Sequence, residues 1–126
     1  MKDVVLTDRA PAPVGPYSQA IEAGGCLYVS GQIPLDPKTG AMARPDIKVQ
    51  TRRVLDNVMA VLDAAGAAPG DVVKTTVFMT DLSRFTAMNE VYAEYFGEAP
   101  PARACVEVGA LPKGSLVEIE CVARIG

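Results

Sequence analysis

Residues 100–120 read Pro-Pro-Ala-Arg-Ala-Cys-Val-Glu-Val, then Gly-Ala-Leu-Pro-Lys-Gly, then Ser-Leu-Val-Glu-Ile-Glu. The first and last of these runs alternate apolar and polar residues, as strands with one buried face do. The run between them has glycine at both ends and one proline, which is typical of a turn. The stretch therefore predicts a β-hairpin-like unit around which the rest of the fold is arranged.

The predicted pairing of these two strands brings their polar side chains together. If Val108 pairs with Ser115 in an antiparallel register, Cys105 lies across from Glu118. The same register places Arg103 across from Glu120. Side chains alternate between the two faces of a strand, so these four would share one face. We therefore expect an arginine, a thiol and two carboxylates on one patch of the sheet.

The chain has 126 residues, 49% of them hydrophobic, which suits a single domain over residues 1–126 with a substantial core. Its net charge of −3 and the lack of a basic run disfavour nucleic acid as a partner. The N-terminal segment lacks the apolar region of a signal peptide, and no apolar run approaches the roughly 20 residues of a membrane span. We therefore expect a soluble, cytoplasmic protein without a membrane partner.

The composition also limits the chemistry that is open to the chain. It contains no histidine, which removes the commonest general base and the commonest metal ligand. Its three cysteines are widely spaced within apolar segments, so neither a disulfide framework nor a zinc site is indicated. Any reaction must use carboxylates, tyrosine, lysine, cysteine, arginine or backbone groups.

The segments before residue 100 predict two helices and several strands. Apolar residues recur at helical spacing between Asp46, the expected N-cap, and Gly66, the expected residue after the helix end. Residues 71–80 are rich in Val, Thr and Phe and predict a strand, and residues 84–96 predict a second amphipathic helix. Shorter strands are expected at residues 17–22 and 26–30. The order predicts an α+β domain with about six strands in a mixed sheet and two helices packed on one face.

Two helices cover only one face of such a sheet. Residues 26–30 and 72–78 nevertheless carry apolar or small side chains on both faces. A symmetric homo-oligomer is the simplest way to bury the uncovered face. A site on that face is then expected at or near a subunit interface.

Arg103 and Glu118 are the residues whose chemistry stands out. An arginine inside a strand is either a surface residue of an edge strand or a carboxylate-binding group, because its guanidinium presents paired donors. A glutamate that alternates with apolar residues either belongs to a solvated face or, when partly buried near an arginine, orients or deprotonates a water. In a chain without histidine, Glu118 is the best-placed base.

Cys105, Tyr17 and Ser30-Gly31 give weaker signals. No neighbouring base is evident to activate the thiol of Cys105, which favours a structural cysteine whose backbone N–H is able to donate to a ligand. Tyr17 follows a rigid Gly-Pro pair, and it is either a core or lid residue or presents its hydroxyl to a pocket. Ser30 and Gly31 end a strand, and glycine there lets a ligand approach the backbone closely.

Taken together, these motifs resemble those of the Rid family, the reactive intermediate (enamine/imine) deaminases formerly called the YjgF family. The similarity covers nearly the whole chain, and the segment from Arg103 to Glu118 is its most specific part. The other matching motifs are Gly-Pro-Tyr-Ser-Gln-Ala at 15–20, Ser-Gly-Gln-Ile-Pro at 30–34, Met-Asn-Glu-Val-Tyr at 88–92 and Leu-Pro-Lys at 111–113.

The resemblance implies a chorismate-mutase-like α+β fold and a homotrimer with three clefts, each between two subunits. It implies that Arg103 grips the substrate carboxylate and that Glu118 positions the hydrolytic water. The substrate-binding residues that it implies are Tyr17, Ser30, Gly31, Asn89, Arg103 and Cys105.

The implied activity is that of a 2-iminobutanoate/2-iminopropanoate deaminase. Such an enzyme hydrolyses 2-enamines and 2-imines, such as 2-aminoacrylate and 2-aminocrotonate, to 2-keto acids and ammonia. Pyridoxal-phosphate enzymes release these compounds from serine or threonine. An imine is already electrophilic, so this reaction needs a carboxylate anchor and an aligned water but no metal and no cofactor.

Three other functions stay open. A non-catalytic module of the same fold would bind small 2-keto or amino acids with the same pocket. A pathway-specific deaminase, for instance of the 2-aminomuconate type, would also share these residues. Ribonuclease or chaperone-like activity has been ascribed to relatives, and the lack of histidine and of a basic groove makes RNA cleavage the least supported.

Overall fold

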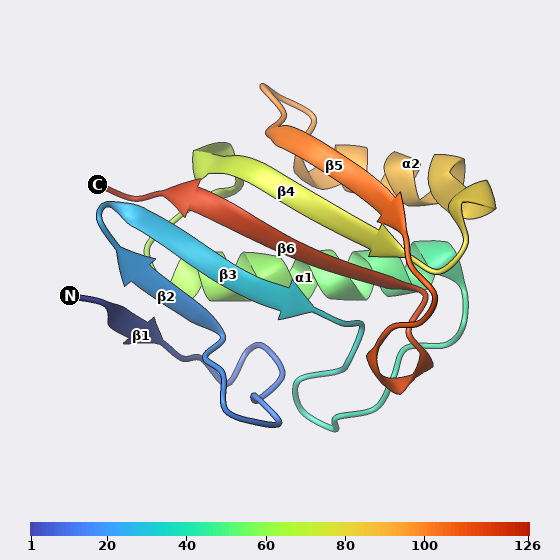
Figure 1. The fold of residues 1–126 in the computed structure, drawn as a ribbon, viewed down its shortest axis with the longest axis horizontal. Helices are drawn as coiled ribbons and strands as arrows, with labels where there is room; N and C mark the ends of the chain where they lie inside the picture. The colour runs from blue at the N-terminus through green and yellow to red at the C-terminus, as the bar shows by residue number, and fades with distance from the viewer.

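The computed structural model describes residues 1–126 as one sheet with two helices on a single face (Figure 1). The strands are β1 Asp3–Val5, β2 Ala20–Ala23, β3 Cys26–Gln32, β4 Val72–Met79, β5 Ala102–Glu107 and β6 Val117–Arg124. The α-helices are α1 Ile47–Ala64 and α2 Phe85–Tyr95, and short 3-10 turns occur at Pro69–Asp71, Leu82–Arg84 and Pro112–Gly114. The predicted α+β class, with a mixed six-stranded sheet and two helices on one face, is confirmed.

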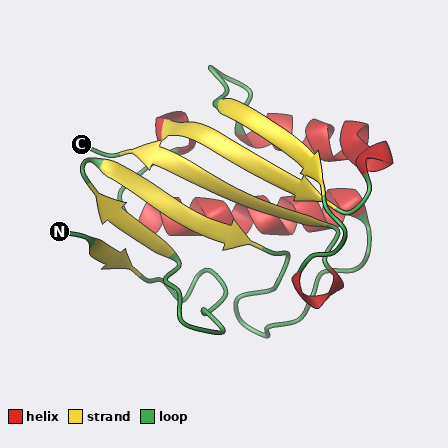
Figure 2. Cartoon of the chain, viewed as in Figure 1, coloured by secondary structure: helices red, strands yellow, loops and turns green.

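The strands lie in the order β1-β2-β3-β6-β4-β5 (Figure 2). Every neighbouring pair is antiparallel except β4 and β5, which are parallel. Parallel strands need a crossover connection, and α2 supplies it between β4 and β5. The predicted hairpin is therefore wrong, because β5 and β6 do not pair with each other but lie on either side of β4.

The composition of the two strands accounts for this arrangement. In β6 the side chains of Val117, Ile119 and Cys121 are buried, and the strand pairs with β3 on one side and β4 on the other. By contrast, β5 follows Pro100 and Pro101 and has no fully buried residue, as suits an edge strand. Alternation along a strand specifies its two faces but not its partner.

The register distributes the predicted polar patch over two faces of the sheet. Arg103 pairs with Thr75 of β4, which is fully buried beneath the helices, so Arg103 points to the helix side. Cys105 follows two residues later and shares that side. Glu118 and Glu120 alternate with the buried residues of β6 and therefore lie on the opposite, helix-free face. The expected pairing of Cys105 with Glu118, and of Arg103 with Glu120, is wrong.

Helix α1 begins and ends where the sequence predicted. Oδ1 of Asp46 accepts the backbone N–H groups of Lys48 at 2.9 Å and Val49 at 3.0 Å, which satisfies donors that the first turn leaves open. Gly66 follows the end of the helix at φ 75°, a left-handed conformation that glycine adopts without strain.

The hydrophobic core lies between the two helices and one face of the sheet. The helix-free face instead leaves apolar side chains open to solvent. Tyr28 of β3 is 50% exposed and Val106 of β5 is 41% exposed.

No helix combines the length and the apolar character that crossing a bilayer requires.

Candidate functional site

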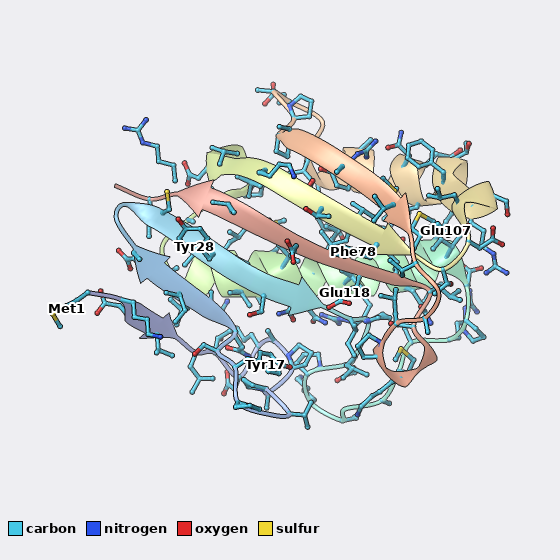
Figure 3. The ribbon with its side chains drawn as sticks, in the orientation of Figure 1. Met1, Tyr17, Tyr28, Phe78, Glu107 and Glu118 are labelled. Carbon is cyan, nitrogen blue, oxygen red and sulfur yellow. The ribbon has the colours of Figure 1, made fainter.

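The predicted site residues form two groups on opposite faces of the sheet. The helix-side group consists of Asn89, Arg103 and Cys105. The group on the helix-free face consists of Tyr17, Ser30, Gly31 and Glu118, which line one cavity. Figure 3 shows Glu118 on β6 with Phe78 near it on β4.

The first group forms the arginine pocket, a cavity of about 440 Å³ beside edge strand β5. It is lined by Asn89, Tyr92, Ala93, Phe96, Gly97, Pro100, Pro101 and Arg103. Nη1 of Arg103 donates a hydrogen bond of 2.7 Å to Oδ1 of Asn89. The guanidinium carbon lies 4.7 Å from the ring centre of Tyr92 and 5.4 Å from that of Phe85. The other guanidinium N–H groups have no hydrogen-bond partner within the chain.

Three residues of α2 that hold Arg103 come from one face of that helix. Phe85, Asn89 and Tyr92 follow one another at spacings of four and three residues, so their side chains lie side by side. From the sequence, Phe85 and Tyr92 were predicted only as part of the amphipathic helix at residues 84–96, and their contact with Arg103 was missed. Their spacing around a polar Asn89 was the available signal.

Cys105 lies at the edge of the core, two residues after Arg103. Its Sγ is 3.8 Å from Sδ of Met79. Burial raises the pKa of the thiol above its ordinary value, and the charge of Arg103 offsets this only in part. A thiol that keeps its proton at neutral pH is a weak nucleophile. The structure therefore favours the structural interpretation of Cys105.

The second group forms the glutamate pocket, a cavity of about 500 Å³ on the helix-free face. It is lined by Val14, Tyr17, Ser30, Gly31, Ile33, Pro112, Lys113, Glu118 and Glu120. The pairing of β3 with β6 shifts register between Val29 and Gln32, and this irregularity lies beside Glu118. Such bulges re-aim side chains at the rims of sheets.

Gly31 lies directly against the side chain of Glu118. A Cβ atom added to Gly31 would overlap a carboxylate oxygen of Glu118 and would lie 2.9 Å from its carboxyl carbon. Gly31 is therefore needed for this close approach of side chain and backbone.

Tyr17 is positioned by an N-terminal segment that Gln19 anchors. The side chain of Gln19 is buried, and its Oε1 accepts a backbone N–H at 2.7 Å while its Nε2 donates to three carbonyl groups at 2.9–3.3 Å, all within residues 7–11. Oγ of Ser30 donates to the carbonyl of Ser18 at 2.6 Å. These bonds hold the residues around Tyr17 against β3. Gln19 was not predicted from the sequence, where its only signal was its place in the 15–20 motif.

Glu118 is half-buried in its pocket. Burial raises its pKa above the ordinary value of 4.5, and the neighbouring carboxylate of Glu120 raises it further. The folded chain therefore binds this proton more tightly than the unfolded chain does. A carboxylate that is partly desolvated and has a raised pKa is better suited to accept a proton from water.

Glu118→Gln is expected to stabilise the fold at neutral pH. Because the folded-state pKa of Glu118 is raised, the free energy of unfolding falls as the pH rises from 4.5 through the raised value. The uncharged amide avoids this loss, so the variant should have the higher melting temperature at pH 7, with the difference shrinking toward pH 4.5. Thermal unfolding followed by circular dichroism measures it. A lower melting temperature for the variant at pH 7 would contradict the desolvation of Glu118.

The two pockets offer different chemistry. The guanidinium of Arg103 matches a carboxylate, and the carboxylate of Glu118 is able to orient a water and take its proton. Within one chain these side chains project from opposite faces of the sheet. A molecule that touches both must therefore lie between two copies of the chain.

The structure has no grouping of three cysteine, aspartate or glutamate residues that could hold a metal ion.

Residues 7–125 match the model of the protein family described as Endoribonuclease L-PSP. A RutC family protein from Pyrococcus horikoshii is 58% identical over 98% of this chain and 98% of its own. A 2-iminobutanoate/2-iminopropanoate deaminase from Salmonella typhimurium is 48% identical, again over 98% of both chains.

Solved structures share the fold over the whole chain. A protein of the Rid family from Yersinia pestis superposes with a TM-score of 0.97 at 52% identity, covering 99% of this chain and 100% of that one. The TdcF protein of E. coli with bound serine superposes with a TM-score of 0.94 at 43% identity, covering 98% and 99% of the two chains. The α+β fold expected from the resemblance is thus confirmed.

Proposed function

The chain belongs to the Endoribonuclease L-PSP family, which includes the Rid proteins, and from this membership we propose that it is a deaminase of 2-imino and 2-enamino acids. Its expected substrates are 2-iminobutanoate and 2-iminopropanoate, together with their enamine forms 2-aminocrotonate and 2-aminoacrylate. The arginine pocket carries the proposal, because Arg103 is fixed by Asn89 and two rings yet keeps donors for a carboxylate. The deaminase from Salmonella typhimurium supports the choice of reaction.

The proposed reaction adds water to the imine carbon. Arg103 binds the substrate carboxylate through paired N–H groups, which fixes the position of the adjacent C=N bond. As the water oxygen bonds to this carbon, Glu118 takes a proton from the water and passes it to the imine nitrogen, which gives a carbinolamine. Glu118 then carries the hydroxyl proton of the carbinolamine to the nitrogen. The C–N bond breaks as the C=O bond forms, and ammonia and a 2-keto acid are released. An enamine enters the same route once its terminal carbon is protonated.

This reaction is proposed to take place between two copies of the chain. Because Arg103 and Glu118 project from opposite faces, one substrate reaches both only where the arginine pocket of one copy meets the glutamate pocket of another. The half-exposed Tyr28 and Val106 on the helix-free face give a neighbouring copy apolar surface to cover. A closed ring of three copies repeats one such contact symmetrically, in keeping with the predicted homotrimer.

A coupled assay tests the activity. A serine or threonine dehydratase generates the imine in solution, and 2-keto acid formation is followed while the purified protein is added. The rate is expected to rise above that of spontaneous hydrolysis in proportion to the amount of protein. A rate that stays at the spontaneous value with folded protein present would overturn the deaminase.

Gly31→Ala is expected to displace the carboxylate of Glu118 while the fold persists, because the new methyl group meets the end of a flexible side chain. Misplacing a catalytic group by about 1 Å costs up to roughly 100-fold, so we expect kcat/KM to fall about 10- to 100-fold. The coupled assay and a melting curve measure the two effects. Gly70→Ala is the matched control, because a Cβ there meets nothing within 4 Å. Unchanged turnover in Gly31→Ala would mean that the position of Glu118 does not limit the reaction.

A non-catalytic module that binds small 2-keto or amino acids is the second candidate. The bound serine in the similar E. coli protein favours it, because an amino acid also offers a carboxylate to an arginine. Such a module would bind 2-oxobutanoate through Arg103 without accelerating imine hydrolysis. Calorimetric titration together with the coupled assay separates the two functions.

A deaminase with a different substrate and a ribonuclease are two further alternatives to the proposed function. A deaminase of the 2-aminomuconate type would use the same pockets, and a higher kcat/KM for that substrate would identify it. RNA cleavage is the least favoured, because the net charge of −3 and the absence of histidine suit neither RNA binding nor acid–base cleavage by imidazole. Degradation of RNA by the pure protein that is lost in Arg103→Ala would favour it.

A further inference from the structure

The ring of Tyr92 lies beneath the guanidinium of Arg103, with 4.7 Å between the guanidinium carbon and the ring centre. We propose that Tyr92 is a positioning residue of the arginine pocket, whose ring holds the guanidinium in the orientation that binds a carboxylate. This inference rests on the proposed function, because it assigns a role within the same site.

Arg103 needs such support because it extends from an edge strand. A long side chain there loses conformational freedom when it binds a ligand, and fixing it beforehand improves affinity. A ring face beneath the guanidinium carbon attracts the cation without accepting a conventional hydrogen bond from its N–H groups. Asn89 accepts a hydrogen bond only from Nη1 of Arg103. The ring and the amide together fix the plane while the remaining donors stay open to a carboxylate.

Tyr92 is itself held from below. Its hydroxyl lies 2.7 Å from Oγ1 of Thr75, a fully buried residue that is the register partner of Arg103 on β4. Its ring also contacts Phe96, with 4.9 Å between ring centres. Burial raises the pKa of the hydroxyl above its ordinary value, so the phenol stays neutral. The sheet thus fixes the position of the Tyr92 ring, and this ring fixes the orientation of the Arg103 guanidinium.

Two variants of Tyr92 separate the ring from the hydroxyl. Tyr92→Leu removes the aromatic face, and we expect KM and the Kd for 2-oxobutanoate to rise about tenfold while kcat changes less than about twofold. Tyr92→Phe keeps the ring and is expected to restore most of this loss, although it gives up the bond to Thr75. The coupled assay gives kcat and KM, and calorimetric titration with 2-oxobutanoate gives Kd.

Tyr95→Leu is the matched control on the same helix. The hydroxyl of Tyr95 donates to Oδ1 of Asp56 at 2.7 Å, and its ring makes no contact with Arg103. This variant is expected to lower the melting temperature without changing KM or Kd. If Tyr92→Leu does not fold, Tyr92→Met replaces it, because methionine fills space with a flexible side chain but has no aromatic face.

Three results would overturn the role of Tyr92. The first is a folded Tyr92→Leu, or Tyr92→Met in its place, with unchanged KM and Kd. The second is a Tyr92→Phe variant as impaired as Tyr92→Leu, which would assign the effect to the hydroxyl. The third is a parent protein that does not bind 2-oxobutanoate. By contrast, a parent that binds this acid without accelerating imine hydrolysis would overturn only the deaminase, and the expected change in Kd would still support the role of Tyr92.

Discussion

Arg103→Ala is expected to lower kcat/KM about 10²- to 10³-fold, equal to about 3–4 kcal/mol of lost transition-state stabilisation. The variant removes the paired donors for the substrate carboxylate, so the substrate loses its anchor. Arg103 is only partly buried on an edge strand, and we expect the melting temperature to change little. The coupled assay with freshly generated 2-aminoacrylate measures the loss.

Arg103→Lys is expected to recover little of this activity. An ammonium group lacks the planar fork that matches a carboxylate, and it stacks less well on Tyr92 and Phe85. Arg52→Ala serves as the matched control, because Arg52 lies on α1 and its guanidinium pairs with Glu94 at the surface. Unchanged deamination by Arg103→Ala would rule out carboxylate anchoring by this residue.

Mixing two inactive variants is expected to restore activity. A site that takes Arg103 from one copy and Glu118 from another is intact where an Arg103→Ala copy supplies Glu118 and a Glu118→Gln copy supplies Arg103. Random assembly of equal amounts makes about one quarter of the sites intact, because each site draws its two halves independently. Co-expression in equal amounts gives the randomly assembled oligomers for the coupled assay, and two affinity tags show that mixed oligomers are present.

The matched control for mixing combines the parent chain with the double variant Arg103→Ala/Glu118→Gln. Sites shared between copies then retain about one quarter of the parent activity, whereas sites within single copies would retain about one half. No recovered activity from the two single variants, in oligomers shown to contain both, would contradict a shared site.

The sequence was sufficient to predict the elements but not all of their neighbours. The caps Asp46 and Gly66 and the helical spacing between them act locally, so α1 was predicted closely. Strand β1 was missed, because three residues carry too little periodicity to stand out. The pairing of β5 with β4 depends on the packing of α2 and on which strand is buried most. The alternation of apolar and polar residues along 102–107 predicts neither.

The sequence pointed to residues that line two pockets, but not to the arrangement of these pockets. The motifs around Tyr17, Gly31 and Arg103 pointed to the residues that line the two pockets. The hairpin hypothesis put Arg103 beside Glu120, and the inserted β4 reversed the face on which Arg103 lies. Tyr92 and Gln19 were missed because their roles depend on contacts across the fold: one supports a guanidinium, and the other ties down a loop.

The central place of β6 has a consequence for how the chain is made. Strands β3 and β4 are complete once residue 79 has been synthesised, yet β6, which joins them, ends at Arg124. Until that last strand leaves the ribosome, both strands expose an open edge, and such edges favour aggregation in a nascent chain. The sheet therefore closes only after residue 124 has emerged, so its strands do not assemble one after another from the N-terminus.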